Sequence, residues 1–202
     1  QLCHPGFTPP QLTWLRQKSE CDAASYLAAA LAERFALPPC EAERDFLTLL
    51  FTLLKTHSYD SSDSPEDQHL QEQVHRLIGR FQQIAGMSFS SREGLAGQLF
   101  THLGAAIERC RFDIGIDHTL LEEVTRMYPR LMRTTLEALE EFEAAYDLRL
   151  SPEEVGLITI CFGAWLMHGG ALQEKQVLLL TNGNPELETA VEQHIRDRSE
   201  EH

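Results

Sequence analysis

Positive charge is scarce in this sequence. The 202 residues include 17 Lys and Arg against 31 Asp and Glu, which gives a formal net charge of −14 at pH 7. Proteins that bind nucleic acids or anionic membranes through phosphate contacts present clustered cations on their surface. We therefore expect that this chain contacts neither DNA, RNA nor a membrane directly.

Long hydrophobic runs and paired cysteines are also missing. No apolar run approaches the length of a membrane span and no signal peptide is visible, so we expect a cytoplasmic chain. The five cysteines are odd in number, show no CxxC spacing and lie in apolar neighbourhoods. This pattern predicts reduced, buried thiols, and we expect no disulfide, no metal and no cofactor. The chain opens at Gln1 in mid-pattern, and we expect a fragment of a longer protein.

Helical periodicity dominates what is present. Apolar residues recur every three to four positions, in a chain that is 43% hydrophobic. Two of the expected helices, 40–56 and the one opened by Ser151-Pro152, are apolar almost all round and should be buried. The fold class predicted is an all-α bundle, preceded by a loop over residues 1–11. The expected helices are 12–35, 40–56, 68–85, one capped by Ser90 or Ser91, 119–128 with a restart at Pro129 to residue 146, and one ending before Gly169.

The C-terminal tail has a different pattern. Residues 176–181 form a short apolar strand candidate, 182–185 a turn, and 186–198 a helix. A single β-turn-α unit cannot complete a sheet. The tail is therefore either part of a larger domain or packed on the bundle.

One histidine stands out on the helix that follows Ser91. His102 lies beside an apolar stripe and is followed by Gly104, Ala105 and Ala106, which leave open space on its face. Arg109, two turns on, lies on the same side, and its guanidinium can approach whatever His102 carries. This arrangement suits a phosphoryl acceptor; a packed structural histidine is the alternative. The stripe consists of Leu95, Leu99, Leu103, Ala106 and Cys110.

The pattern around His102 resembles a known family. The strings THLGAAIER, DIGIDHTLLEEV, YPRL and SPEEVGLITICFGAWL occur in that order. They are similar to the two signatures of the PTS regulation domain (PRD), found in bacterial sugar-responsive antiterminators and activators. The tail resembles the start of the IIB-like domain that follows PRDs in several activators, with Thr181 and Asn182 where that domain has a phosphorylatable cysteine.

The resemblance implies a phosphoryl relay. In the family, the carrier HPr or a sugar-specific enzyme II phosphorylates PRD histidines, and the added charge resets PRD pairing in a homodimer. His102 matches the first family histidine and is the predicted phosphoacceptor, and Arg109 is the predicted phosphate contact. Cys161 occupies the second histidine position, and Leu50 occupies the equivalent position of an earlier repeat. The resemblance implies that nucleic acid is bound by another segment of the regulator.

An internal repeat supports a division into domains. Shifting the chain by 111 residues, the separation of Phe35 and Tyr146, also superposes Glu43 on Glu154 and Thr48 on Thr159. The predicted domains are the C-terminal half of a first PRD (1–57), a linker (58–66), a complete PRD (67–172) and the IIB-like tail (173–202).

Several alternatives stay open. Cys161 is either a sensor thiol or, as its apolar helix favours, an inert buried one. Asp113, Asp117 and His118 with His102 are metal-ligand candidates, although solvated loop groups fit their spacing better. Cys161 and His102 could form a catalytic dyad, but the sequence has no catalytic motif around them. We therefore predict that the chain is not an enzyme. The main rival to a phosphorylation sensor is a degenerate PRD that serves as a phosphorylation-independent dimerisation or docking module.

Overall fold

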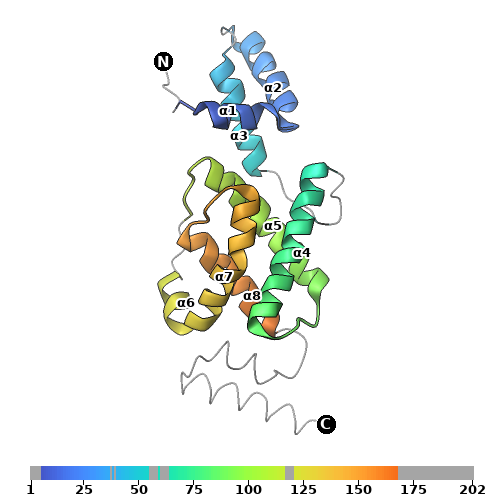
Figure 1. The fold of residues 1–202 in the computed structure, drawn as a ribbon. Coiled ribbons are helices and arrows are strands. Elements are labelled where there is room, and N and C mark those ends of the chain that lie inside the picture. The colour runs from blue at the N-terminus through green and yellow to red at the C-terminus, as the bar shows by residue number, and fades with distance from the viewer. Residues whose placement is uncertain are drawn as a thin grey trace, which may run out of the picture. The chain divides into compact units, whose positions relative to one another are not determined.

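A computed structural model of the chain describes residues 6–36, 38, 40–54, 59, 64–116 and 121–167. These residues form eight α-helices and no strand (Figure 1). They divide into two compact units. Unit 1 comprises the described residues up to Leu54 together with Arg111–Asp113, and unit 2 comprises the rest. The prediction of an all-α fold is confirmed. The predicted strand and helix of the tail lie outside the described residues.

Unit 1 contains three helices where the sequence predicted two. They are α1 (Pro9–Arg16), α2 (Glu20–Phe35) and α3 (Glu41–Leu54). Thr8 and Gln11 form a reciprocal capping box that starts α1 within the predicted loop. A continuous helix over 12–35 is wrong, because the chain turns at 17–19. The residues at this break are all polar, so no apolar side chain continued the stripe there.

The helix α3 is less buried than its composition predicted. Leu54 is 77% exposed and Leu50 is 37% exposed, so the expectation of burial all round is wrong for α3. Its buried face instead carries Asp45, which is 3% exposed and accepts hydrogen bonds from Arg16 and Arg44. The hydrogen bond to Asp45 is the main cause that raises the pKa of the Arg44 guanidinium.

Unit 2 is a bundle of five helices whose ends follow local sequence signals. They are α4 (Pro65–Ala85), α5 (Arg92–Arg111), α6 (Leu121–Met127), α7 (Pro129–Tyr146) and α8 (Pro152–Met167). Ser64 caps α4 three residues earlier than expected, and Gly86 ends it with a φ of 64°. The predicted restart at Pro129 is confirmed, and the Ser151 hydroxyl accepts a hydrogen bond from the Glu154 N–H at the start of α8.

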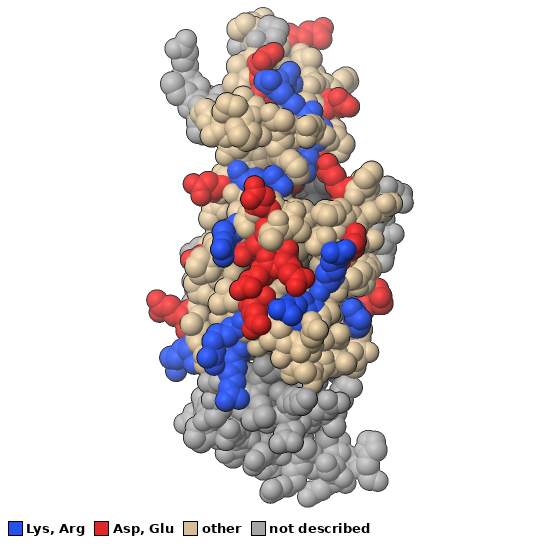
Figure 2. All heavy atoms as spheres, in the orientation of Figure 1, with Lys and Arg blue, Asp and Glu red and all other residues tan. Residues whose placement is uncertain are grey.

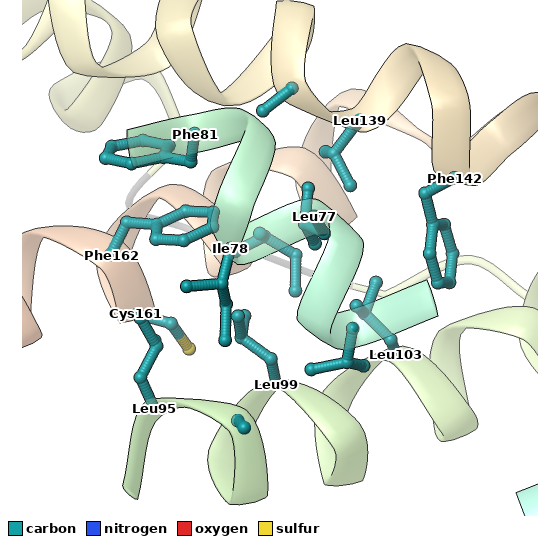
Figure 3. Close-up of a cluster of buried hydrophobic side chains, with 14 of the residues drawn as sticks. Leu77, Ile78, Phe81, Leu95, Leu99, Leu103, Leu139, Phe142, Cys161 and Phe162 are labelled. Atoms are coloured by element: carbon teal, nitrogen blue, oxygen red, sulfur yellow. The ribbon is translucent and has the colours of Figure 1, made fainter. Parts of the chain in front are cut away.

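The core of unit 2 joins four of its helices. Phe81 of α4 stacks on Phe162 of α8 with ring centroids 4.0 Å apart. Leucines of α5 and α7 complete the cluster, as Figure 3 shows. Leu95, Leu99 and Leu103, the stripe predicted beside His102, are fully buried in it. The stripe therefore fixes which side of α5 faces the core.

Part of the predicted linker packs on unit 2. The ring of Tyr59 lies edge-on to Phe100 of α5, with centroids 5.7 Å apart. Its hydroxyl is hydrogen-bonded to His75 on α4, at 2.8 Å, and donates to Glu93 on α5. Tyr59 thereby ties the segment before α4 to both of the helices that open unit 2.

The repeat seen in the sequence is also a repeat in structure. With the same 111-residue shift, α2 ends at Phe35 where α7 ends at Tyr146. The next residues, Ala36 and Asp147, both take the left-handed conformation with a φ of 49°. Helices α3 and α8 then begin at equivalent positions. The set α1–α2–α3 of unit 1 therefore corresponds to α6–α7–α8 of unit 2, and no described helices of unit 1 correspond to α4 and α5.

Candidate functional site

His102 lies on α5, beside the residues that enter the core. Its side chain is half-buried, whereas its neighbour Thr101 is exposed and Leu103 is buried. The imidazole forms no hydrogen bond or ion pair with any other described residue. Imidazole nitrogens without a partner can donate or accept hydrogen bonds and can act as nucleophiles.

Arg109 is held by a carboxylate from another helix. Its Nε and Nη2 atoms donate to the two oxygens of Glu154, at 2.5 and 3.0 Å. The Glu154 residue is 5% exposed and stands in the first turn of α8. This bidentate pair joins the end of α5 to the start of α8. In this state the guanidinium neutralises Glu154, so a phosphoryl group that approached Arg109 would compete with this carboxylate for the positive charge.

A second tie joins the opposite ends of the same helices. The Trp165 indole N–H of α8 donates to the Gln98 side chain of α5, at 2.5 Å. The ring covers Gly94, where an added Cβ would overlap it. One tie joins the start of α5 to the end of α8, and the other joins the end of α5 to the start of α8. The two helices therefore run antiparallel. His102 lies seven positions before Arg109, and Cys161 lies seven positions after Glu154. In an antiparallel pair of helices this places His102 and Cys161 at the same height along the helix axes.

Cys161 is a residue of the core of unit 2. Only 4% of it is exposed, and burial raises the pKa of its thiol to about 11. It belongs to the same cluster as Leu95 and Ile78 (Figure 3). The interpretation as a buried thiol is confirmed, and burial argues against both a sensor thiol and a catalytic dyad because the thiolate is the reactive form.

Alkylation should separate the cysteines of this chain by burial. At pH 7.5 the pKa of about 11 leaves a thiolate fraction on the order of 10⁻³ or less for Cys161. Cys40 is exposed. We expect iodoacetamide to modify Cys40 at least about 100-fold faster than Cys161. Peptide mass mapping over time measures both rates. Equal rates in the folded chain, with Cys161 becoming no faster in urea, would show that Cys161 is not buried.

Only some of the predicted metal-ligand candidates lie among the described residues. Asp113 lies after α5 with a φ of 52°, and Asp117 and His118 lie outside the described residues. Within the described ranges, no three His, Cys, Asp or Glu side chains gather in a way that could hold a metal ion.

Acidic side chains gather in one place on the visible face of the molecule. Figure 2 shows carboxylates gathered at its centre with basic side chains on either side. In unit 2, Arg80 of α4 lies within 4 Å of both Glu137 and Glu141 of α7. This face carries no continuous basic surface of the kind that tracks a phosphate backbone.

Two residues of the site were not identified from the sequence. Glu154 was noted as part of a helix start and a family motif, not as the partner of Arg109. Gln98 was not singled out at all. Both pairings join positions more than 40 residues apart, 45 for Arg109 and Glu154 and 67 for Gln98 and Trp165. No pattern of neighbouring residues predicts such pairs. The presence of a glutamate in one matched motif and an arginine in another could, however, have suggested an ion pair.

Comparisons with known proteins find similar sequences. Residues 75–165 match the family model described as PRD domain. The chain is 39% identical over 193 residues to the stationary phase-inducible protein CsiE of Escherichia coli, and 24% identical over 178 residues to the transcriptional regulator ManR of Bacillus subtilis. These matches cover 96% and 87% of the chain but only 45% and 28% of the relatives. No solved structure matches significantly. No described helix is long and apolar enough to cross a membrane.

Proposed function

We propose that this chain, whose residues 75–165 match the PRD domain model, is the regulatory portion of a bacterial transcriptional regulator that senses sugar transport through phosphorylation of His102. The observation that carries the proposal is the state of His102 itself. It is half-buried and, among the described residues, unpaired, within the matched segment. PRD domains are regulatory and neither relative is named as an enzyme, so no catalytic function is assigned to this segment.

The proposed chemistry is transfer between histidines. A ring nitrogen of His102 attacks the phosphorus of a phosphohistidine on HPr, or of a phosphorylated enzyme II component. An N–P bond to His102 forms as the bond to the donor breaks, and the donor side chain leaves with the electron pair. The product replaces a mostly neutral imidazole with an anion that carries strong hydrogen-bond acceptors.

The charge added at His102 acts on the pair between Arg109 and Glu154. Arg109 lies seven positions after His102, about 10 Å along the helix axis, and a long arginine side chain spans part of that distance. A phosphoryl group in reach competes with Glu154 for the guanidinium. Without Arg109, the carboxylate of Glu154 is an unpaired charge in the first turn of α8. This change biases how two copies of the chain pair in a homodimer.

A degenerate PRD is the second candidate. Cys161, at the position of the second family histidine, is buried, and its raised pKa keeps it as a neutral thiol. The equivalent position of unit 1 is Leu50, which cannot accept a phosphoryl group. A domain with only one histidine of the pair serves equally as a dimerisation or docking module whose input is binding.

Intact mass spectrometry distinguishes the two candidates. The chain is incubated with phosphoenolpyruvate, enzyme I and HPr at neutral or alkaline pH, because phosphohistidine is acid-labile. We expect a mass gain of one phosphoryl group, which disappears in His102→Ala.

The matched control is His75→Ala, which removes a histidine already hydrogen-bonded to Tyr59. It should leave the gain unchanged. No gain with HPr or with enzyme II components would favour the degenerate module. Light scattering of His102→Asp tests the consequence, and an unchanged mass distribution would contradict control of dimerisation by charge at this position.

A further inference from the structure

The core of unit 1 is completed by a side chain from outside its three helices. Phe112, which follows α5 in the sequence, lies in one apolar cluster with Leu15 of α1 and Leu49 of α3. Its ring also packs edge-on against Phe7, with centroids 5.9 Å apart. Leu49 is 8% exposed in this cluster. Unit 1 therefore buries the surface between α1 and α3 with the help of a later segment of the chain.

The repeat places the equivalent surface of unit 2 between α6 and α8. With the 111-residue shift, Leu49 corresponds to Ile160 and Leu53 to Ala164. Leu53 packs against the apolar cluster of unit 1, whereas Ala164 is exposed and Ile160 is 37% exposed. The described part of unit 2 thus has no side chain that covers these positions as Phe112 covers Leu49.

An apolar groove of about 230 Å³ lies at this place in unit 2. Val124 and Tyr128 line it from α6, and Ile160, Ala164 and Met167 line it from α8. None of the described side chains that line the groove is charged. Because a charged group would lose its hydration against such a surface without gaining a partner, the groove favours an apolar occupant.

The chain itself supplies an apolar segment beside the groove. Met167 ends α8 and lines the groove, and Val177–Leu180 is the longest apolar run that follows it in the sequence. This run lies within an uncharged stretch over residues 176–185. The ten residues from Met167 to the run span up to about 33 Å when extended. The groove reaches from Met167 to Ile160, about 10 Å along α8, so the run can reach all of it.

We propose that the groove between α6 and α8 is occupied by Val177–Leu180, the apolar run of this chain's own C-terminal segment. Phe112 is the precedent, because it packs on Leu49 from a segment that follows α3 in the sequence, as Val177–Leu180 follows α8. Docking removes the apolar surface of Ile160 and of the leucines from water, which supplies the driving force. The proposal does not depend on phosphorylation of His102.

Thiol labelling of the 202-residue chain tests whether the groove is covered. Ala164→Cys places a thiol in the groove, and Glu140→Cys is the control, on an exposed position of α7 outside the groove. We expect a maleimide to label position 164 at least about tenfold more slowly than position 140, because the docked segment must leave before the reagent enters. Fragment-ion mass spectrometry separates a label at position 164 from one at Cys161.

Changes within the C-terminal segment test whether Val177–Leu180 is the cover. Replacing all three of Leu178–Leu180 by Asp should raise the labelling rate at position 164 to that at position 140. The matched control replaces Gln173, Gln176 and Thr181 by Asp, which adds the same charge beside the run. It should leave position 164 protected. Circular dichroism checks that both variants keep their helices.

A change in the groove gives an independent reading, with the C-terminal segment left intact. Ile160→Asp should speed trypsin cleavage after Lys175, two residues before the run, by at least about fivefold, because the undocked segment is open to the protease. The control is Leu136→Asp, at a position that is 47% exposed and outside the groove, and it should leave the cleavage rate unchanged.

Three outcomes of the labelling experiment would overturn the proposal. Equal rates at positions 164 and 140 with the segment unchanged would show that the groove is open in this chain. Protection that persists when Leu178–Leu180 are replaced would assign the cover to another part of the chain. Protection that disappears on dilution would assign it to a second copy.

Discussion

Replacing Arg109 by alanine is expected to lower the free energy of unfolding of unit 2 by about 3 kcal/mol, near the lower end of the range for a broken buried ion pair. The reason is the partner left behind. The Glu154 side chain is 7% exposed, and its carboxylate would lose the bidentate donor that neutralises it. Arg109 is itself 21% exposed, so water replaces part of the lost interaction.

Tryptophan fluorescence can follow unit 2 separately. The sequence has two tryptophans, Trp14 in unit 1 and Trp165 in unit 2, so a Trp14→Phe background reports urea unfolding of unit 2. The matched control is Arg149→Ala. Arg149 pairs with Glu143 but is 90% exposed, and its loss should cost less than about 1 kcal/mol. Equal costs for Arg109→Ala and Arg149→Ala would mean that the Glu154 pair is solvated like a surface pair.

Replacing Phe162 by alanine is expected to destabilise unit 2 by about 3–5 kcal/mol, the usual cost of a large-to-small change at a buried aromatic. Phe162 is fully buried and stacks on Phe81, with ring planes 11° apart. The ring of Phe89 also packs against Phe162, with centroids 5.9 Å apart. The deletion therefore removes apolar contacts of α4 and α8 at once and leaves a cavity that neighbouring rings cannot fill without leaving their rotamers.

The control for this change lies in the same unit. Leu136 of α7 is 47% exposed, and Leu136→Ala should cost less than about 1 kcal/mol in the same urea experiment. Phe162→Leu, which keeps most of the volume, should fall between the two. A loss below about 1 kcal/mol for Phe162→Ala would show that the core of unit 2 closes around the missing ring.

The helix ends were the part of the fold that the sequence predicted best, because they depend on residues close together along the chain. Gly86, Pro129 and the Ser151-Pro152 pair each fix a backbone conformation or satisfy terminal N–H groups within a few residues. The break after Arg16 was missed because a polar stretch carries no periodic signal. The start of α4 was placed three residues late for a similar reason, since Ser64 lies in a run of loop-like residues.

Burial of α3 shows the limit of composition as a guide. Helices α3 and α8 are both apolar nearly all round, and the sequence predicts burial for both. Cys161 is buried because α4 and α5 pack beside α8, whereas Leu50 has no such neighbours among the described residues. Exposure depends on what lies next to a helix, and composition does not specify the neighbour.

The sequence by itself determined the helical class, most helix ends, the 111-residue repeat and the singling out of His102, because these depend on residues close together along the chain or on matched motifs. Only the tertiary structure decided that Arg109 is paired with Glu154, that His102 lies level with Cys161, and that Phe112 lies in one cluster with Leu49. Those features join positions tens of residues apart. Their energies come from burial and charge pairing, which exist only once the helices are packed.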